Sequence, residues 1–174
     1  MLSLPAIQSK MMKTEIAIST VINAVIIPVL LWLAPIPPPL ELWGANGVAA
    51  SLVKGTIIPV LLMSTLITFL LRKRVTKMNL APLDRSATPF AWLGGLPSLP
   101  PLRAVIFVLA ALVTVMPVSL AVAGALKTYP MTEPSFFLFN VVYGVVIALM
   151  VTPFVVLAVL HEPRKTPVNL VSAQ

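Results

Sequence analysis

Side chains able to do acid–base, nucleophilic or metal chemistry are few in this chain of 174 residues. It contains one histidine, His161, five acidic residues and no cysteine. This inventory excludes zinc sites built from several histidines or cysteines, bis-histidine haem ligation within the chain, and a cysteine nucleophile. The sequence also lacks a glycine-rich phosphate loop, a G-x-S-x-G turn and an H-E-x-x-H motif. We therefore expect a protein that is not an enzyme and that carries no metal and no cofactor.

Lys54 is the charged residue with the clearest potential to form a site, because it lies inside an apolar stretch, 48–71. It falls seven positions into that stretch, which is about 10 Å along a helix. If the stretch spans a membrane, a charge at this depth is costly unless it snorkels, pairs or faces water. Two interpretations remain: snorkelling beside Glu41 or Glu133, or a functional cationic site.

Amide and phenol groups extend the set of candidate residues within the apolar stretches. They are Asn23 in the first stretch, and Asn140 and Tyr143 in the last. Such groups either hydrogen-bond between helices or line a pathway for a polar solute. The five acids lie in or near the expected loops, so a proton relay through a carboxylate within the membrane is not predicted.

The elements that would position these residues are four apolar stretches, each close to the roughly 20 residues that a membrane-spanning helix needs. They run approximately over 16–33, 48–71, 104–126 and 136–160. With 59% hydrophobic residues, 10% charged residues and a mean hydropathy of +1.02, the chain has too few charges to cover a soluble globule. We predict an all-α integral membrane protein, in which residues 1–174 form a single domain of four transmembrane helices in an antiparallel bundle.

Basic residues set the expected orientation, because cytoplasmic segments of membrane proteins are enriched in lysine and arginine. Ten of them precede the first stretch, separate the second from the third, or follow the fourth: Lys10, Lys13, Arg72, Lys73, Arg74, Lys77, Arg85, Arg103, Arg164 and Lys165. Four crossings place all ten on one side, while Lys54 and Lys127 lie towards the other. Both termini and the loop 72–103 are therefore predicted to be cytoplasmic. No nucleic-acid partner is expected.

A juxtamembrane cluster within this basic set is predicted to attract the anionic headgroups of the lipid bilayer. Its residues are Arg72, Lys73, Arg74 and Lys77.

Prolines and small residues give the stretches their expected shape and packing. Each stretch holds one proline that is predicted to kink its helix, because proline removes a backbone hydrogen bond. These are Pro28, Pro59, Pro117 and Pro153. Small residues spaced four apart are expected to let neighbouring helices approach closely. They are Gly47, Ser51 and Gly55, then Ala121 and Ala125, then Gly144 and Ala148.

The first half of the chain resembles a family of small bacterial four-helix inner-membrane proteins whose activity is uncharacterised. The similarity rests on TEIAISTVINAVIIPVLLWL, with Glu15 and Asn23, and on LLMSTLITFLLRKR, which ends in the basic triplet Arg72–Arg74. The chain departs from the family at SLVKGT, where the family has an acidic and Pro-Gln element, so Lys54 lies in the divergent region. The resemblance implies a bacterial inner-membrane location and four spans, and it implies no activity.

Three functions are compatible with these patterns. The leading hypothesis is a non-enzymatic accessory or scaffold subunit that binds other membrane proteins or forms a homo-oligomer, because its small-residue faces and the apolar segment 89–102 are packing features. The first alternative is a small oligomeric transporter or channel for an anion or polar solute, with Lys54 in the pathway. The second is a lipid- or pigment-binding membrane subunit.

Overall fold

The structure is a computed structural model that describes residues 5–33, 41–44, 47–84, 88–125 and 131–163. Its elements are α1 (Ala6–Leu33), α2 (Val48–Lys77), the 3-10 helix η2 (Ala91–Gly95), α3 (Pro100–Ala125) and α4 (Glu133–Leu160). The described residues contain no β-strand, which confirms the predicted all-helical class. All four α-helices are long and apolar enough to cross a membrane. The basic residues Arg85, Lys127, Arg164 and Lys165 lie outside the described part of the chain.

The helices are longer than the apolar stretches that predict them. α1 already begins at Ala6, and α2 continues through the basic triplet to Lys77. Lysine, arginine, methionine and glutamine have good helix propensity, so they extend a helix beyond its apolar part. α3 begins at Pro100, where proline is tolerated because the first-turn N–H groups have no intrahelical acceptor. The segment joining α2 to α3 is therefore 78–99 rather than the predicted 72–103.

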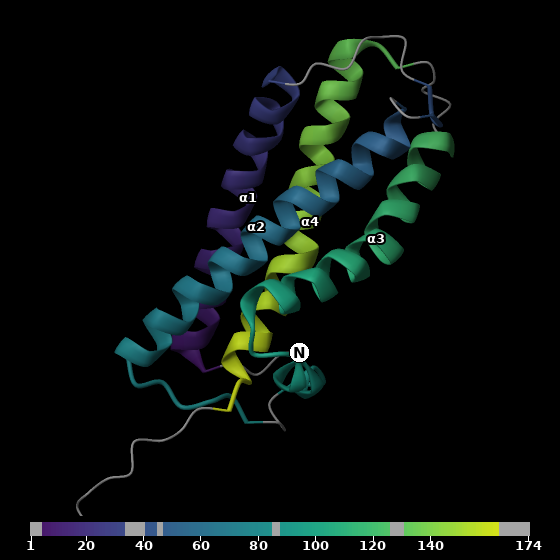
Figure 1. Cartoon of the computed structure of the whole chain (residues 1–174). Helices are drawn as coiled ribbons and strands as arrows, with labels where there is room; N and C mark the ends of the chain where they lie inside the picture. The colour runs from purple at the N-terminus through teal and green to yellow at the C-terminus, as the bar shows by residue number, and fades with distance from the viewer. Residues whose placement is uncertain (1–4, 34–40, 45–46, 85–87, 126–130, 164–174) are drawn as a thin grey trace, which may run out of the picture.

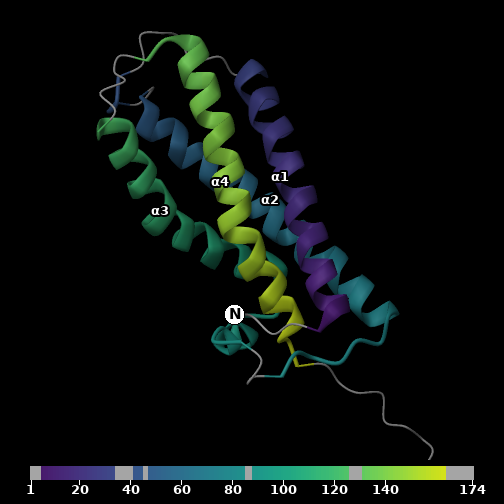
Figure 2. The same ribbon diagram turned by 180° about the vertical axis from the view of Figure 1, so that it is seen from behind.

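Consecutive helices run in opposite directions, and α4 lies between the others (Figures 1 and 2). α1 packs along α4, while α2 crosses α4 diagonally and packs along α3. The pairs α1–α2 and α3–α4 touch far less. α3 bends along its length, so that its C-terminal half diverges from α4 (Figure 2). Each of these two weakly packed pairs leaves a cavity.

One end of the molecule collects the start of α1, the end of α2, the segment 78–99, the start of α3 and the end of α4; we call it the basic end (Figure 1). The described residues 78–84 and 88–99 fold over the end of α4 there. Leu83 N donates to Leu160 O at 2.8 Å, and the rings of Phe90 and Phe154 form an edge-to-face pair with centroids 5.3 Å apart. A Cβ added at Gly94 would lie 2.7 Å from the backbone oxygen of His161, so only glycine allows η2 to approach α4 this closely.

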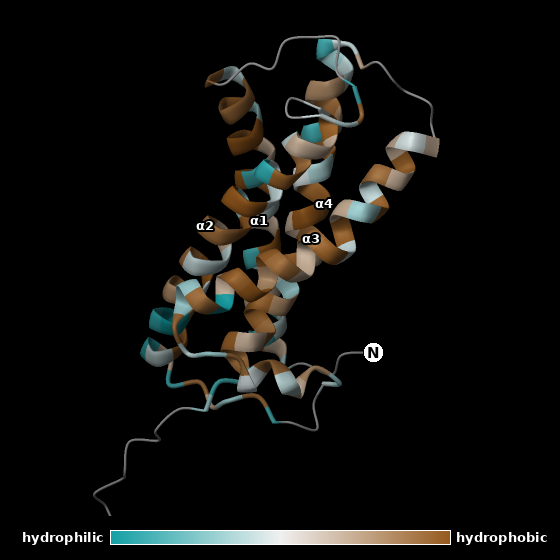
Figure 3. Ribbon diagram, turned by 45° about the vertical axis from the view of Figure 1, so that its right-hand side comes forward, coloured by the Kyte–Doolittle hydropathy of each residue, from teal (hydrophilic) through white to brown (hydrophobic). Residues whose placement is uncertain are grey.

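Hydrophobic residues make up most of the four helices (Figure 3), and many of them are exposed. Large aliphatic and aromatic residues are exposed on all four helices, among them Val21, Leu62 and Val113. Exposing so much apolar area to water is unfavourable, whereas contact with lipid hydrocarbon is not. The interior between α1, α2 and α4 contains several buried polar side chains, among them Asn23, Thr56 and Asn140.

Each helix continues through its proline without ending: Pro28 in α1, Pro59 in α2, Pro117 in α3 and Pro153 in α4. The small residues are divided between core and surface. Gly47, Ser51, Gly144 and Ala148 are buried, Gly55 is half-buried, and Ala121 and Ala125 are exposed.

Gly144 makes the closest helix contact among the small residues. A Cβ added there would overlap Cδ1 of Ile27 and lie 3.2 Å from its Cγ1. The absence of a side chain at Gly144 therefore allows α1 and α4 to approach closely at this point.

Candidate functional site

A network of charged side chains joins the helices at the basic end. Glu162, just after α4, accepts two hydrogen bonds from Arg72 of α2, at 2.8 Å from Nε and 2.6 Å from Nη2. Arg103 of α3 places its Nη1 3.7 Å from the same carboxylate. Arg72 Nη2 also donates to Ser98 O at 2.5 Å, and Arg103 Nε donates to Pro97 O at 3.1 Å. One carboxylate and two guanidinium groups thus tie α2, α3, α4 and the segment 78–99 together.

Arg103 is the most unusual member of this network because its side chain is 0% exposed. Its two terminal nitrogens, Nη1 and Nη2, have no hydrogen-bond partner among the described residues. Two positive groups share one negative group, which leaves the Arg72–Arg103–Glu162 cluster with one uncompensated positive charge. A buried charge without full compensation is costly, so a further anion at this end would be favoured.

A second ion pair links the first two helices. Arg74 Nη1 donates to Glu15 Oε1 at 2.7 Å, and the Glu15 side chain is only 6% exposed. Of the cluster predicted to bind lipid headgroups, Arg72 and Arg74 are therefore engaged with acids of the same chain. Lys73 lies over the ring of Phe69, with Nζ 4.5 Å from the centroid, and Lys77 is exposed.

His161 has a packing role at the end of α4. Its Nδ1 lies 2.9 Å from the carbonyl oxygen of Leu157, which can only accept, so Nδ1 carries a proton. In the neutral ring Nε2 then accepts from the hydroxyl of Thr88, 3.1 Å away. Both nitrogens are engaged within the chain. No cluster of three or more histidine, cysteine or acidic residues suited to a metal occurs in the part of the chain that the structure describes.

Polar side chains form a seam between α1, α2 and α4, and the sequence-predicted residues Asn140 and Tyr143 belong to it. The hydroxyls of Tyr143 and Thr56 lie 2.6 Å apart, and Ser51 Oγ donates to Asn140 Oδ1 at 3.3 Å. These two contacts join α2 to α4 directly.

The third predicted residue, Asn23, lies in the same seam but contacts different groups. Its amide donates to Ser19 O at 2.9 Å and to the sulfur of Met63 at 3.1 Å, which joins α1 to α2. The sequence identifies Asn23, Asn140 and Tyr143 but not Thr56, and the pairing of these residues depends on how the helices face one another.

Lys54 lies outside this seam. Its side chain is exposed on α2, and it forms no salt bridge with any acid among the described residues. The structure thus separates Lys54 from Asn23, Asn140 and Tyr143, with which the sequence grouped it as a candidate pathway residue.

A groove of about 110 Å³ runs between α1 and α2, which we call the α1–α2 groove. Its floor carries buried polar groups from Glu15, Ser19 and Asn23, and the Met63 side chain. Its rim is aliphatic and exposed, with residues repeating every four positions on both helices. The exposed rim residues are Ile18 and Ile22 on α1, and Leu62, Leu66 and Leu70 on α2.

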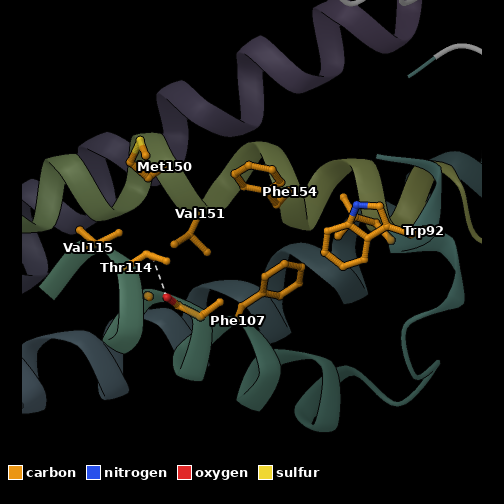
Figure 4. Close-up of a pocket in the computed structure, with 10 residues that line it drawn as sticks. Trp92, Phe107, Thr114, Val115, Met150, Val151 and Phe154 are labelled. Carbon is orange, nitrogen blue, oxygen red and sulfur yellow. Dashed lines mark hydrogen bonds between the residues drawn. The ribbon is translucent and has the colours of Figure 1, made fainter. Parts of the chain in front are cut away.

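A larger cavity of about 230 Å³ lies between α3, α4 and η2 (Figure 4); we call it the α3–α4 cavity. The rings of Phe107, Phe154 and Trp92 line the part nearest the basic end, and Val115 and Met150 line the opposite part. Its one hydroxyl, on Thr114, donates to Ala110 O at 2.7 Å, and the indole of Trp92 lies at its basic end. The cavity suits an apolar occupant.

The chain has no significant match among protein-family models, curated proteins or solved structures. The interpretation of its function therefore rests on its own residues and geometry.

Proposed function

We propose that this chain is an integral membrane protein of four spans, located in a bacterial inner membrane with its basic end in the cytoplasm. Four apolar helices with large exposed hydrophobic residues support insertion, and the excess of lysine and arginine at one end supports the orientation. Both termini are then cytoplasmic, and successive helices cross the membrane in opposite directions.

Within the membrane we propose a non-enzymatic accessory role, in which the α1–α2 groove receives a transmembrane helix of another membrane protein. The observation that carries this proposal is a groove between two weakly packed helices whose aliphatic rim is exposed. Glu15, Ser19 and Asn23 are buried beneath the rim, and Glu15 and Asn23 already bond to Arg74 and Met63 within the chain, so a partner helix would pack against the aliphatic rim above them. The four-residue spacing of the rim matches the ridges of an incoming helix.

The orientation is tested by labelling single cysteines with a membrane-impermeant maleimide in intact cells. The natural chain contains no cysteine, so each introduced thiol reports alone. Glu133→Cys, at the end opposite the basic end, should be labelled from outside, and Lys77→Cys should react only after the membrane is opened. Labelling of Lys77→Cys in intact cells would contradict the orientation.

The docking role is tested by placing a photo-crosslinking amino acid at Leu66, on the groove rim, and at Val113 of α3 as the matched exposed aliphatic control. A partner helix in the groove should give one defined heterologous adduct from Leu66 and none from Val113. Equal adducts from both positions, or only lipid adducts, would overturn the role. An adduct with a second copy of the chain would instead identify a homo-oligomer.

An oligomeric transporter or channel for an anion is the second candidate, and the exposed, unpaired position of Lys54 favours it. Because Lys54 lies outside the polar seam, its ammonium would line a path only between copies of the chain. Lys54→Leu should then abolish anion flux into liposomes. An accessory subunit without a pathway would show no flux with either residue, and its Leu66 adduct would be unchanged by the substitution.

A further inference from the structure

We propose that the α3–α4 cavity holds one acyl chain of an anionic phospholipid, whose phosphate lies at the basic end near the Arg72–Arg103–Glu162 cluster, where Arg72 is the more exposed basic member and Arg103 acts from beneath the surface. The proposal rests on the proposed membrane insertion, and it is independent of partner docking in the α1–α2 groove. It assigns an occupant to a cavity and to a buried charge that the accessory role leaves unused.

The cavity selects the apolar part of this ligand. At about 230 Å³ it exceeds a cavity of roughly 150 Å³ that admits benzene, and it falls below the 300–1,000 Å³ typical of sites for drug-sized molecules. Its lining is apolar apart from the indole N–H of Trp92 and the hydroxyl of Thr114, which is already bonded to Ala110 O. A single hydrocarbon chain fits both the size and the apolar lining, with the indole of Trp92 at the headgroup end.

The position of the cavity allows an acyl chain to enter it from the bilayer. It lies between two helices that both span the membrane in the proposed insertion, and these two helices pack weakly against each other. Ala110 and Met150 line it and are exposed, so an acyl chain enters sideways from the bilayer without crossing water. The exposed indole of Trp92 lies at the basic end of the cavity, where an amphipathic ring suits the level of the headgroups (Figure 4).

The charge at the basic end selects the headgroup. Arg103 precedes the lining residue Phe107 by four positions, one helical turn of about 6 Å along α3. Arg72 and Arg103 share the single carboxylate of Glu162, and Arg103 Nη1 and Nη2 have no hydrogen-bond partner among the described residues. A phosphate with one net negative charge at this end balances the cluster, whereas a zwitterionic headgroup brings no net charge. The cavity should therefore prefer an anionic phospholipid over a zwitterionic one.

The experiment uses Trp92 as the reporter. Trp32→Phe and Trp43→Phe leave it as the only tryptophan of the full chain, which is reconstituted into vesicles of mixed phosphatidylglycerol and phosphatidylcholine. In paired samples of equal composition, the acyl chains of one or the other lipid carry bromine, which quenches a tryptophan in contact. We expect brominated phosphatidylglycerol to be favoured at Trp92 about fivefold over brominated phosphatidylcholine, as one uncompensated basic group implies.

Two variants separate the parts of the site. Ala110→Phe fills the cavity from an exposed lining position and should abolish the preference, while Val113→Phe, on the exposed face of α3 outside the cavity, should retain it. Arg103→Met should lower the ratio of quenching by brominated phosphatidylglycerol to quenching by brominated phosphatidylcholine towards one. Both lipids should still quench Trp92. If Arg103→Met does not fold, the pair Ala110→Phe and Val113→Phe still decides the question.

The outcomes distinguish this inference from the proposed insertion. Equal quenching by both lipids, or a preference that survives Ala110→Phe, overturns the lipid site while insertion stands. Absence of quenching by either brominated lipid shows that Trp92 does not contact acyl chains, which overturns the lipid site, while insertion of the four helices is decided by the cysteine labelling.

Discussion

Gly144→Ala offers the sharpest test of how α1 and α4 pack. The substitution adds one methyl group to α4 at the point where Ile27 of α1 lies against it. The new Cβ would overlap Cδ1 of Ile27 and approach Cγ1 to 3.2 Å. Cβ of Asn23, also on α1, lies 3.8 Å from the same point. The two helices must therefore separate, or Ile27 must change its rotamer.

The expected cost follows from two opposed effects. Inserting a methyl group into a packed interface costs about 1–3 kcal/mol. Alanine is favoured over glycine inside a helix by roughly 0.5–1 kcal/mol, which offsets part of that cost. We therefore expect Gly144→Ala to lower the free energy of unfolding by about 0.5–2 kcal/mol.

A second substitution identifies the cause. Ile27→Val removes Cδ1, the atom that the new methyl group would overlap, so it should restore much of the stability lost in Gly144→Ala. The coupling energy between the two sites should be of order 1 kcal/mol and favourable. Gly55→Ala is the matched control in α2, because a Cβ there would meet nothing within 4 Å. That variant should be neutral or slightly more stable than the natural protein.

The assay is reversible unfolding in mixed micelles with rising amounts of a denaturing detergent, followed by circular dichroism. The packing argument is wrong if Gly144→Ala is as stable as Gly55→Ala. It is also wrong if Ile27→Val adds its own loss to that of Gly144→Ala without compensation, because the two positions would then not be in contact.

Three further expectations concern other contacts. Tyr143→Phe should cost about 0.5–1.5 kcal/mol in the same unfolding assay by removing the hydroxyl bonded to Thr56, and it should cost almost nothing more in a Thr56→Val background. Arg74→Gln should destabilise the protein more than Glu15→Gln, since the Glu15 side chain is 6% exposed and that of Arg74 is 45% exposed; the opposite ranking would contradict this assignment. Gly94→Ala should release η2 from α4 and speed proteolysis of the segment 78–99, whereas Gly95→Ala, with nothing within 4 Å of its Cβ, should leave the cleavage rate unchanged.

The number and type of the elements could be predicted from the sequence because both depend on local properties. Long apolar runs form helices regardless of their neighbours, so the four apolar stretches each correspond to one helix. The predicted ends of the helices agree less well with the structure. Polar residues such as Lys10 and Lys77 extend the helices beyond their apolar parts, and hydropathy alone does not mark where a helix stops.

The sequence also identified most of the polar residues that matter, but not their partners. Asn140 and Tyr143 are recognisable as unusual in an apolar helix, whereas Ser51 is predicted only as a small packing residue and Thr56 carries no distinctive signal. Arg103 was counted as one basic residue among ten, and no local pattern indicated that it would be fully buried.

By itself, then, the sequence determined an all-helical chain with four helices apolar enough to cross a membrane, one histidine, no cysteine and a basic bias at one end. The tertiary structure decided which face of each helix is buried. A helix that is apolar on all sides has no stripe to show its inner face, so rotation about its axis and its crossing angle are set only by packing. Those two variables bring Arg72 to Glu162 across 90 residues, turn Lys54 outward, and open a cavity between α3 and α4.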